Sequence, residues 1–328
     1  RCPSLPDLET DMKPTIPMLL TVLLAVASFQ PPTLLAGDHE QKSILVTGAS
    51  SGIGRHLAET LASAGHHVYA GARKDEDLAA LNALDNITAV RLDVTQQDEI
   101  DAVAALIEER GTGLYGLVNN AGIGDGGPVV DTPVEVQSFV YDINVEGVYR
   151  VTRAFAPMVI AANGRIATTG SIAGTLSWAG GSAYSGSKHW IEAFTDALAG
   201  EMAAHDVQVS VIQPGNFQSR IRRSAIQRQQ ARALEGGGEM TPEMEEQFSA
   251  TEARELSYQT PEAVSEAFMH ALFDEAPLRR YMVVPNAEEQ QMTIGTKIQQ
   301  LIQLNEWGPY SYSEEELVSL LQAALSED

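Results

Sequence analysis

From Ser43 onward, short apolar segments alternate with longer amphipathic segments. The apolar segments are typical of buried strands and occupy residues 43–47, 67–71, 88–92, 115–119, 164–170, 207–213 and 280–284. Sequences with helical periodicity lie between them, and the first three reach Ala64, Leu81 and Glu109. Parallel strands need crossover connections, usually helices, so this alternation predicts an α/β fold. We expect a parallel sheet with helices on both faces, which gives three α/β/α layers.

The alternation is interrupted once, between residues 216 and 258. This segment includes the run EGGGEMTPE and is the least regular part of the chain. Long insertions in a compact domain usually form functional lids or disordered segments, and we expect a lid here. After Pro285, amphipathic patterns over residues 294–307 and 313–325 predict a C-terminal helical extension, residues 286–328. The expected organisation is a single domain over residues 41–285 that carries the lid, followed by this extension.

The first forty residues, 1–40, differ in kind from the rest. The apolar run over residues 16–29 is shorter than the roughly 20 residues of a spanning helix and suits the core of a signal peptide. Three acidic side chains within residues 1–11 do not suit a leader, so we expect translation to begin at Met12. Cleavage after Ala27 or Ala36 would export the protein, to the periplasm for example. An uncleaved run would instead be a membrane anchor or an apolar extension of a cytoplasmic protein, and the location stays open.

Composition excludes several kinds of function. The formal net charge is −23, whereas nucleic-acid binding needs a basic face that neutralises phosphates. The single cysteine, Cys2, leaves no intrachain disulfide, and we expect neither a thiolate zinc site nor a cysteine nucleophile. His66 and His67 are adjacent at an expected strand start, where neighbouring side chains point to opposite faces. We therefore expect no metal site.

A glycine-rich turn joins the first expected strand to the first expected helix. Gly48, Gly52 and Gly54 follow the spacing GxxxGxG. Glycines at such a junction let the backbone approach a pyrophosphate and direct the helix N-terminus toward it. A glycine-rich turn without special purpose is the alternative, but the position after a strand favours nucleotide binding. The fold is therefore expected to be a doubly wound, Rossmann-type sheet.

The end of the second expected strand bears on which dinucleotide binds. An acidic residue there would bind the adenosine ribose of NAD, whereas an arginine accommodates the 2′-phosphate of NADP. Ala72 stands where the acid would be expected, and Arg73 follows it. We predict a preference for NADP(H). NAD(H) remains the alternative, in which Arg73 is a surface charge beside the acidic residues 75–77.

Taken together, the motifs resemble those of the short-chain dehydrogenase/reductase family. They occur in the family's order: TGASSGIG at Thr47–Gly54, LDV with Asp93, NNAG at Asn119–Gly122, DINVEG with Asn144, TTGSIAG with Ser171, YSGSK with Tyr184 and Lys188, and QPGNFQS with Ser219. The resemblance runs from about residue 43 to 285 and is strongest to the branch of hydroxysteroid and retinol dehydrogenases. Two positions depart from the pattern. Trp190 stands where small residues are common in that branch, and Ser219 stands where many members have threonine.

The resemblance implies hydride transfer between the nicotinamide and an alcohol or carbonyl carbon. Tyr184 would exchange the proton, and Lys188 would hold the ribose and lower the pKa of the tyrosine. Ser171 would donate a hydrogen bond to the substrate oxygen, and Asn144 would hold a water on a proton route to the lysine. The implied cofactor-binding residues are Gly48, Ser50, Ser51, Gly52, Ile53, Gly54, Arg73, Asp93, Val94, Asn120, Ala121, Gly122, Tyr184, Lys188, Pro214, Gly215 and Phe217.

The same branch implies a bulky hydrophobic secondary alcohol or ketone, such as a steroid, retinoid or lipid, and a homodimer or homotetramer. Trp178 and Trp190 would line the substrate pocket or pack against helices. The expected lid carries a basic cluster, which would be an anion-recognising face or a helix solvated by its own charges: Arg220, Arg222, Arg223, Arg228 and Arg232. Two other functions stay open. One is a non-catalytic nucleotide sensor, and the other is a membrane-tethered lipid-binding protein that has kept the fold.

Overall fold

The computed structural model describes residues 41–326. The signal-like run, its cleavage positions and the expected start at Met12 lie outside these residues. In the described part of the chain, no helix has both the length and the apolar character required to cross a bilayer.

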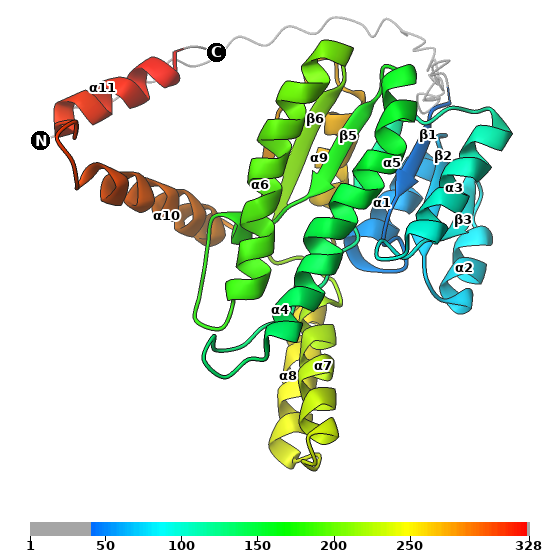
Figure 1. Cartoon of the computed structure of the whole chain (residues 1–328), viewed down its shortest axis with the longest axis horizontal. Helices are drawn as coiled ribbons and strands as arrows, with labels where there is room; N and C mark the ends of the chain where they lie inside the picture. Colours follow the sequence, from blue (N-terminus) through cyan, green and yellow to red (C-terminus); the bar gives the residue numbers. More distant parts are fainter. Residues whose placement is uncertain (1–40, 327–328) are drawn as a thin grey trace, which may run out of the picture. The chain divides into compact units, whose positions relative to one another are not determined.

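Seven parallel strands form one sheet in the order β3-β2-β1-β4-β5-β6-β7, as Figure 1 shows. Their bounds are β1 Ser43–Val46, β2 His67–Ala72, β3 Ile87–Arg91, β4 Gly116–Asn119, β5 Arg165–Thr169, β6 Gln208–Pro214 and β7 Arg280–Val283. The chain builds outward from β1 to β3, returns to place β4 beside β1, and then builds outward to β7. The expected doubly wound α/β fold is confirmed. A sheet of this kind binds ligands at the carboxyl ends of its strands, where the order reverses.

Helices cover both faces of the sheet (Figure 1). One face packs against α1 (Gly52–Ser63), α2 (Asp75–Asn82) and α9 (Glu262–Phe273), through side chains such as Leu57, Leu81 and Phe268. The other face packs against α3 (Gln97–Arg110), α5 (Val148–Ala161) and α6 (Ser182–Met202), through side chains such as Ile107, Phe155 and Leu198. Alternation along β1 divides the two cores, because Ile44 and Val46 face the first and Leu45 faces the second.

The segment that leads into α5 is one long helix with a change of pitch. It begins as α4 (Val134–Tyr141), widens to the π-helix η1 (Asp142–Gly147) and continues as α5. Short π-helical stretches inside α-helices are rare and are found frequently at functional sites. Two 3₁₀ turns complete this half of the fold, η2 (Ile172–Gly174) after β5 and η3 (Ala203–His205) after α6.

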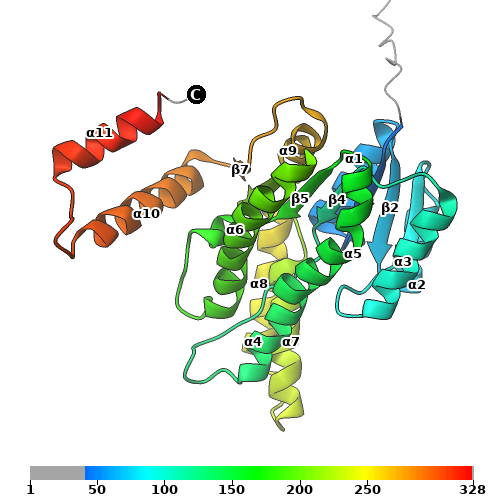
Figure 2. The same cartoon turned by 45° about the horizontal axis from the view of Figure 1, so that its top comes forward.

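The segment over residues 216–258 contains two helices, although its sequence shows little regularity. These are α7 (Ile221–Glu235) and α8 (Pro242–Ser257), which pack against each other and project from the end of the sheet where the strands terminate (Figures 1 and 2). Gly237, with a φ of 87°, reverses the chain after α7. The Thr241 side chain caps α8 by accepting a hydrogen bond from the Met244 amide. We refer to α7 and α8 as the lid.

Two further helices follow β7. They are α10 (Ala287–Asn305) and α11 (Glu314–Ala324). The sequence pattern predicted the first of them from residue 294, but the helix begins at 287 because the Asn286 side chain caps it by accepting from the Glu289 amide. Ser313 and Glu316 form a capping box at the start of α11.

Candidate active site

A cavity of about 370 Å³ opens at the carboxyl ends of the central strands. Its wall contains all seventeen residues that the sequence suggested for cofactor binding, from the glycine turn to Phe217. Ser171, Tyr184 and Lys188 line the same cavity, whereas Asn144 is buried behind it. The folded chain therefore brings the expected cofactor residues and three of the four expected catalytic side chains around one space.

The glycine turn requires glycine for steric reasons. Gly48 and Gly52 have φ values of 67° and 57°, which L side chains rarely adopt. A Cβ on Gly48 would lie 2.8 Å from the Ala121 Cα. Helix α1 begins directly after this turn, and the side chain of its N-cap residue, Ser51, makes no capping hydrogen bond. Its first amides are therefore open to an anion, which is the environment that a dinucleotide pyrophosphate requires.

Asn120 joins the ends of three strands beside this turn. Its Nδ2 donates to the carbonyls of Thr47 at 3.0 Å and Gly48 at 3.2 Å, and its Oδ1 accepts from the Thr169 hydroxyl at 3.1 Å. The Thr47 hydroxyl in turn accepts from the amides of Asn120 and Ala121, at 2.9 and 3.0 Å. These bonds hold the carboxyl ends of β1, β4 and β5 in register, and so they hold the floor of the cavity.

Arg73 and Asp93 line the cavity where the chain leaves β2 and β3. Asp93 Oδ1 accepts from the Thr95 amide at 3.0 Å and from the Thr95 hydroxyl at 2.8 Å. Burial alone would raise the pKa of Asp93, but the bonds from Thr95 and the Arg73 charge outweigh it, so this pKa is lowered. Arg73 Nη1 lies 3.4 Å from Asp93 Oδ2, and the arginine side chain is 61% exposed. This loose ion pair leaves the guanidinium accessible to a ligand phosphate.

Tyr184 and Lys188 lie one turn apart on α6. Lys188 Nζ donates to the Thr169 carbonyl at 2.8 Å and lies 5.9 Å from the centre of the Tyr184 ring. Burial lowers the pKa of Lys188 to about 8, although the charge of Glu192 opposes this shift. A lysine with this pKa is still largely protonated at neutral pH.

The pKa of Tyr184 is raised, although the sequence led us to expect it to be lowered. Burial of the phenol is the largest cause, and it outweighs the opposing effects of a hydrogen bond with Ser171 and the Arg222 charge. In the protein without ligand the phenol is therefore neutral and carries its proton at neutral pH. The expectation was wrong because desolvation of the phenol exceeds the combined effect of the Ser171 hydrogen bond and the Arg222 charge, and Lys188 is not among the causes of the shift.

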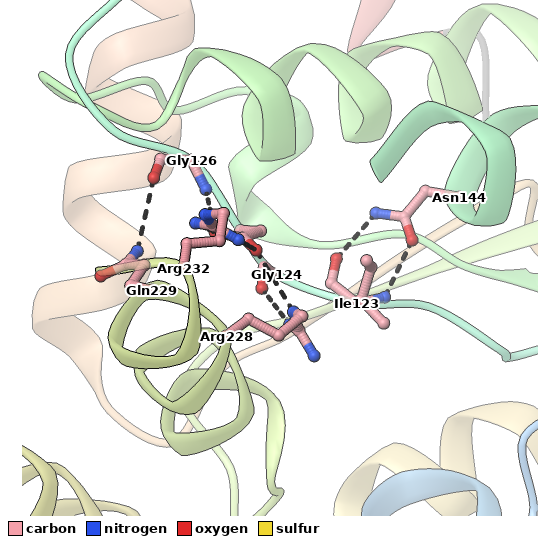
Figure 3. Close-up of polar contacts among 8 residues, drawn as sticks. Ile123, Gly124, Gly126, Asn144, Arg228, Gln229 and Arg232 are labelled. Carbon is pink, nitrogen blue, oxygen red and sulfur yellow. Dashed lines mark hydrogen bonds and ion pairs between the residues drawn. The ribbon is translucent and has the colours of Figure 1, made fainter. Parts of the chain in front are cut away.

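Asn144 lies in the π-helix η1 and connects two segments of the site. Its Oδ1 accepts from the Ile123 amide and its Nδ2 donates to the Ile123 carbonyl, both at 2.9 Å (Figure 3). The same Nδ2 donates to the Ser187 hydroxyl at 3.0 Å. Asn144 therefore fastens the loop after β4 to the helix that carries Tyr184 and Lys188. Its expected role in holding a water remains a prediction.

Three of the five arginines in the basic cluster form ion pairs with acidic side chains, so these three are not solvated only by their own charges. Arg223 forms an ion pair with Glu252 at 2.7 Å. Arg228 and Arg232 both contact Asp125, which lies in the loop after β4. The sequence-based interpretation missed Asp125 because it is 103 residues from Arg228 and belongs to no motif. Other cavity-lining residues that the sequence did not suggest come from neighbouring loops and the lid: Lys74, Thr169, Ile221 and Ser224.

The two tryptophans have different surroundings. Trp190 stacks on Phe194 with ring centres 4.7 Å apart, and it does not line the cavity. Trp178 is 53% exposed, and its ring centre lies 6.3 Å from that of Tyr184. Packing therefore accounts for Trp190, whereas Trp178 lies beside the site. Among residues 41–326, no group of His, Cys, Asp and Glu side chains is arranged to hold a metal ion.

The chain is similar in sequence and in fold to known short chain dehydrogenases. Residues 42–230 match the model of the short chain dehydrogenase family. The mitochondrial D-beta-hydroxybutyrate dehydrogenase of Bos taurus is 36% identical over 73% of this chain and 67% of its own length. Human retinol dehydrogenase 16 is 33% identical over 73% of this chain and 80% of its own length. A short chain dehydrogenase/reductase from Burkholderia phymatum, solved in complex with NAD, superposes with a TM-score of 0.68 at 25% identity, covering 83% of this chain and 98% of that one.

Proposed function

The chain belongs to the short-chain dehydrogenase/reductase family of NAD(P)-dependent oxidoreductases, which act on CH–OH and C=O groups, and on that premise we propose its cofactor preference and substrate class. It prefers NADP(H) and acts on a hydrophobic secondary alcohol or ketone. The observation that carries the cofactor preference is the pair Ala72 and Arg73 at the end of β2. Ala72 is buried and offers no carboxylate to a ribose, while Arg73 lines the cavity with an accessible guanidinium.

The residues of the site suit carbonyl reduction at neutral pH. The nicotinamide supplies or accepts the hydride when the cofactor is bound. Ser171 and Tyr184 bind the substrate oxygen, and Tyr184 donates its proton as negative charge develops there. The raised pKa of Tyr184 keeps the phenol protonated, which is the state that reduction requires. Lys188 carries positive charge beside the phenol and stabilises the phenolate that remains after proton transfer.

Steady-state kinetics with both cofactors test the NADP(H) preference. An arginine hydrogen bond to a phosphate contributes about 1.5–3 kcal/mol, so the KM for NADPH is expected to be at least about tenfold below that for NADH. Arg73→Ala removes this difference, whereas Lys74→Ala, the neighbouring cation, retains most of it. Equal KM values for the two cofactors in the unaltered protein contradict the proposed preference.

An apolar rim beside Tyr184 supports a hydrophobic substrate. Val129 and Val130, in the loop after β4, are 75% and 92% exposed, and Trp178 lies beside the tyrosine. A Cβ on Gly126 would meet the Gly180 carbonyl at 2.5 Å, so the two loops that carry these side chains are in contact. The name of retinol dehydrogenase 16 agrees with this substrate class.

Nicotinamide absorbance over a panel of ketones of increasing apolar size tests the substrate class. We expect kcat/KM to rise with apolar area, because each buried CH₂ contributes about 0.8 kcal/mol. A best substrate among short polar ketones contradicts the proposal. NADPH binding without turnover of any substrate would instead favour the nucleotide-sensor function. We also propose a homodimer or homotetramer, which light scattering of the purified chain measures and a monomer mass contradicts.

A further inference from the structure

A buried carboxylate fastens the lid to the loop after β4. The Asp125 side chain is 0% exposed and receives hydrogen bonds from two arginines of α7, Arg228 and Arg232. Arg232 donates from both terminal nitrogens, at 2.8 and 2.9 Å, in the bidentate geometry typical of strong guanidinium–carboxylate pairs. Arg228 donates from Nε at 3.2 Å. Burial alone would raise the pKa of Asp125, but these arginines and the Gly126 amide lower it, so the carboxylate is ionised.

The two arginines share Asp125 but differ in what else they reach. Both terminal nitrogens of Arg232 are used on the carboxylate, and this side chain does not line the cavity. Arg228 does line the cavity. Its Nε bonds Asp125 and its Nη2 bonds the Gly124 carbonyl at 2.5 Å, while Nη1 has no hydrogen-bond partner within residues 41–326 (Figure 3). Arg228 therefore presents an unused donor at the cofactor cavity.

The charges around this donor favour an anion. One carboxylate faces two guanidinium groups, so the cluster retains an excess positive charge. Arg73, Lys74 and Arg220 line the same cavity, and the acidic side chains on its wall are Asp77 and Asp93. Burial lowers the pKa of Arg228, and the charges of Arg232 and Arg73 lower it further although Asp125 opposes them. A phosphate bound beside Arg228 would relieve this repulsion between cations.

We propose that Arg228 is a cofactor-binding residue carried by the lid, which binds a phosphate of the dinucleotide, and that Asp125 is the residue that positions it. The phosphate is either the pyrophosphate at the start of α1 or the 2′-phosphate beside Arg73. Both groups would offer the same anionic oxygens to the free Nη1. The inference rests on the proposed use of NADP(H), and it assigns Arg228 of the basic cluster to the cofactor and not to an anionic substrate.

The loop that carries Asp125 also contacts Asn144, which is buried behind the cavity. Ile123, two residues before Asp125, exchanges hydrogen bonds with Asn144 through both its amide and its carbonyl. The four residues from Ile123 to Gly126 thus connect the lid arginines to Asn144 in the π-helix η1 (Figure 3). Because residues 123–126 contact both the lid arginines and Asn144, loss of the Asp125 contacts is expected to weaken cofactor binding and to lower kcat.

Direct titration of NADPH and NADH onto the purified full chain tests the inference without a known substrate. The variants are Arg228→Gln and its matched control Arg232→Gln. Arg232 lies in the same helix and contacts the same carboxylate as Arg228, but it does not line the cavity. Arg228→Gln is expected to raise the Kd for NADPH about tenfold or more, as for loss of a hydrogen bond to a charged group. Arg232→Gln is expected to change it less than about threefold. Thermal unfolding of both variants confirms that each is folded.

The change in the Kd for each cofactor in Arg228→Gln identifies which phosphate Arg228 binds. Weaker binding of NADPH alone assigns Arg228 to the 2′-phosphate, whereas equal weakening of NADPH and NADH assigns it to the pyrophosphate. Equal losses in the Arg228 and Arg232 variants, or no loss in Arg228→Gln, overturn the inference. The proposed NADP(H) preference fails separately, when the unaltered protein binds NADH as tightly as NADPH.

A double-mutant cycle tests the role of Asp125. Asp125→Asn keeps an acceptor but removes the charge that holds Arg228. We expect it to raise the Kd for NADPH in the unaltered background and to have little further effect in the Arg228→Gln background. Equal effects of Asp125→Asn in both backgrounds contradict the positioning role.

Discussion

Replacing Gly54 by alanine probes the closest backbone approach in the cofactor turn. A Cβ at this position would lie 2.2 Å from Asn120 Nδ2 and 2.5 Å from the Gly48 carbonyl oxygen. Both distances are far below van der Waals contact. The methyl group must therefore displace the Asn120 amide from its bonds to Thr47 and Gly48, or move the carbonyl of the glycine turn itself.

The size of the effect follows from these contacts. Loss of the two Asn120 bonds costs about 2 kcal/mol at the net value of roughly 1 kcal/mol for each. Overpacking of a tight site adds about 1–3 kcal/mol, and the better helix propensity of alanine offsets up to about 1 kcal/mol. Gly54→Ala is thus expected to lower the free energy of unfolding by about 2–4 kcal/mol. Displacement of the turn is expected to raise the Kd for NADPH at least about tenfold.

Urea unfolding and NADPH titration measure the two effects. Gly200→Ala is the matched control, because Gly200 also lies in a helix but a Cβ there meets nothing within 4 Å. That variant is expected to gain about 0.5–1 kcal/mol and to bind NADPH normally. The reasoning is refuted if Gly54→Ala is as stable as the Gly200 variant and binds NADPH with unchanged affinity.

Three further predictions concern the catalytic side chains and the rim. Because the pKa of Lys188 is about 8, kcat/KM for reduction should fall as the pH rises through that value. Lys188→Arg should shift this fall in kcat/KM to higher pH. A fall at the same pH in the variant contradicts its assignment to Lys188. In the unfolded chain the pKa of lysine is about 10.4. Between about pH 8 and about pH 10.4 the unfolded state therefore binds more protons than the folded state, so the contribution of Lys188 to the free energy of unfolding rises with pH. A series of urea titrations at different pH values measures this rise. Asn144→Ala removes the bonds that the part-buried Ile123 amide and carbonyl make to this side chain, so it should lower the free energy of unfolding by about 1–3 kcal/mol in urea titrations and lower kcat; wild-type stability would contradict the observed bonds. Trp178→Ala should raise KM for large apolar ketones more than for small ones, and equal changes argue against the apolar rim.

Much of the fold was predictable because the periodicity of each segment and the order of the segments along the chain indicate the same architecture. The alternation of apolar and amphipathic segments determines a parallel sheet, and the glycine turn marks its ligand-binding end. Ser171 and Tyr184 belong to motifs that resemble those of the short-chain dehydrogenase/reductase family, and that resemblance placed them together at the site.

The remaining features depend on contacts that the sequence does not display. Asp125 and Arg228 meet only because β4 and the lid end at the same edge of the sheet, 103 residues apart in the chain. The direction of the Tyr184 pKa shift depends on how deeply the phenol is buried, which no motif records. The sequence pattern did not mark the bounds of the lid helices, because α7 is polar and arginine-rich with a weak apolar period and α7 and α8 pack mainly on each other.

The central claim is that Tyr184 transfers the proton in an NADP(H)-dependent reaction, and Tyr184→Phe tests it most directly. The measurement is turnover of a hydrophobic ketone with NADPH, paired with the Kd for NADPH of the same protein. General acid catalysis contributes about 10²–10⁴-fold, so turnover is expected to fall by that factor while the Kd stays within about twofold. Turnover within about tenfold of the unaltered protein, at unchanged NADPH affinity, would contradict the claim.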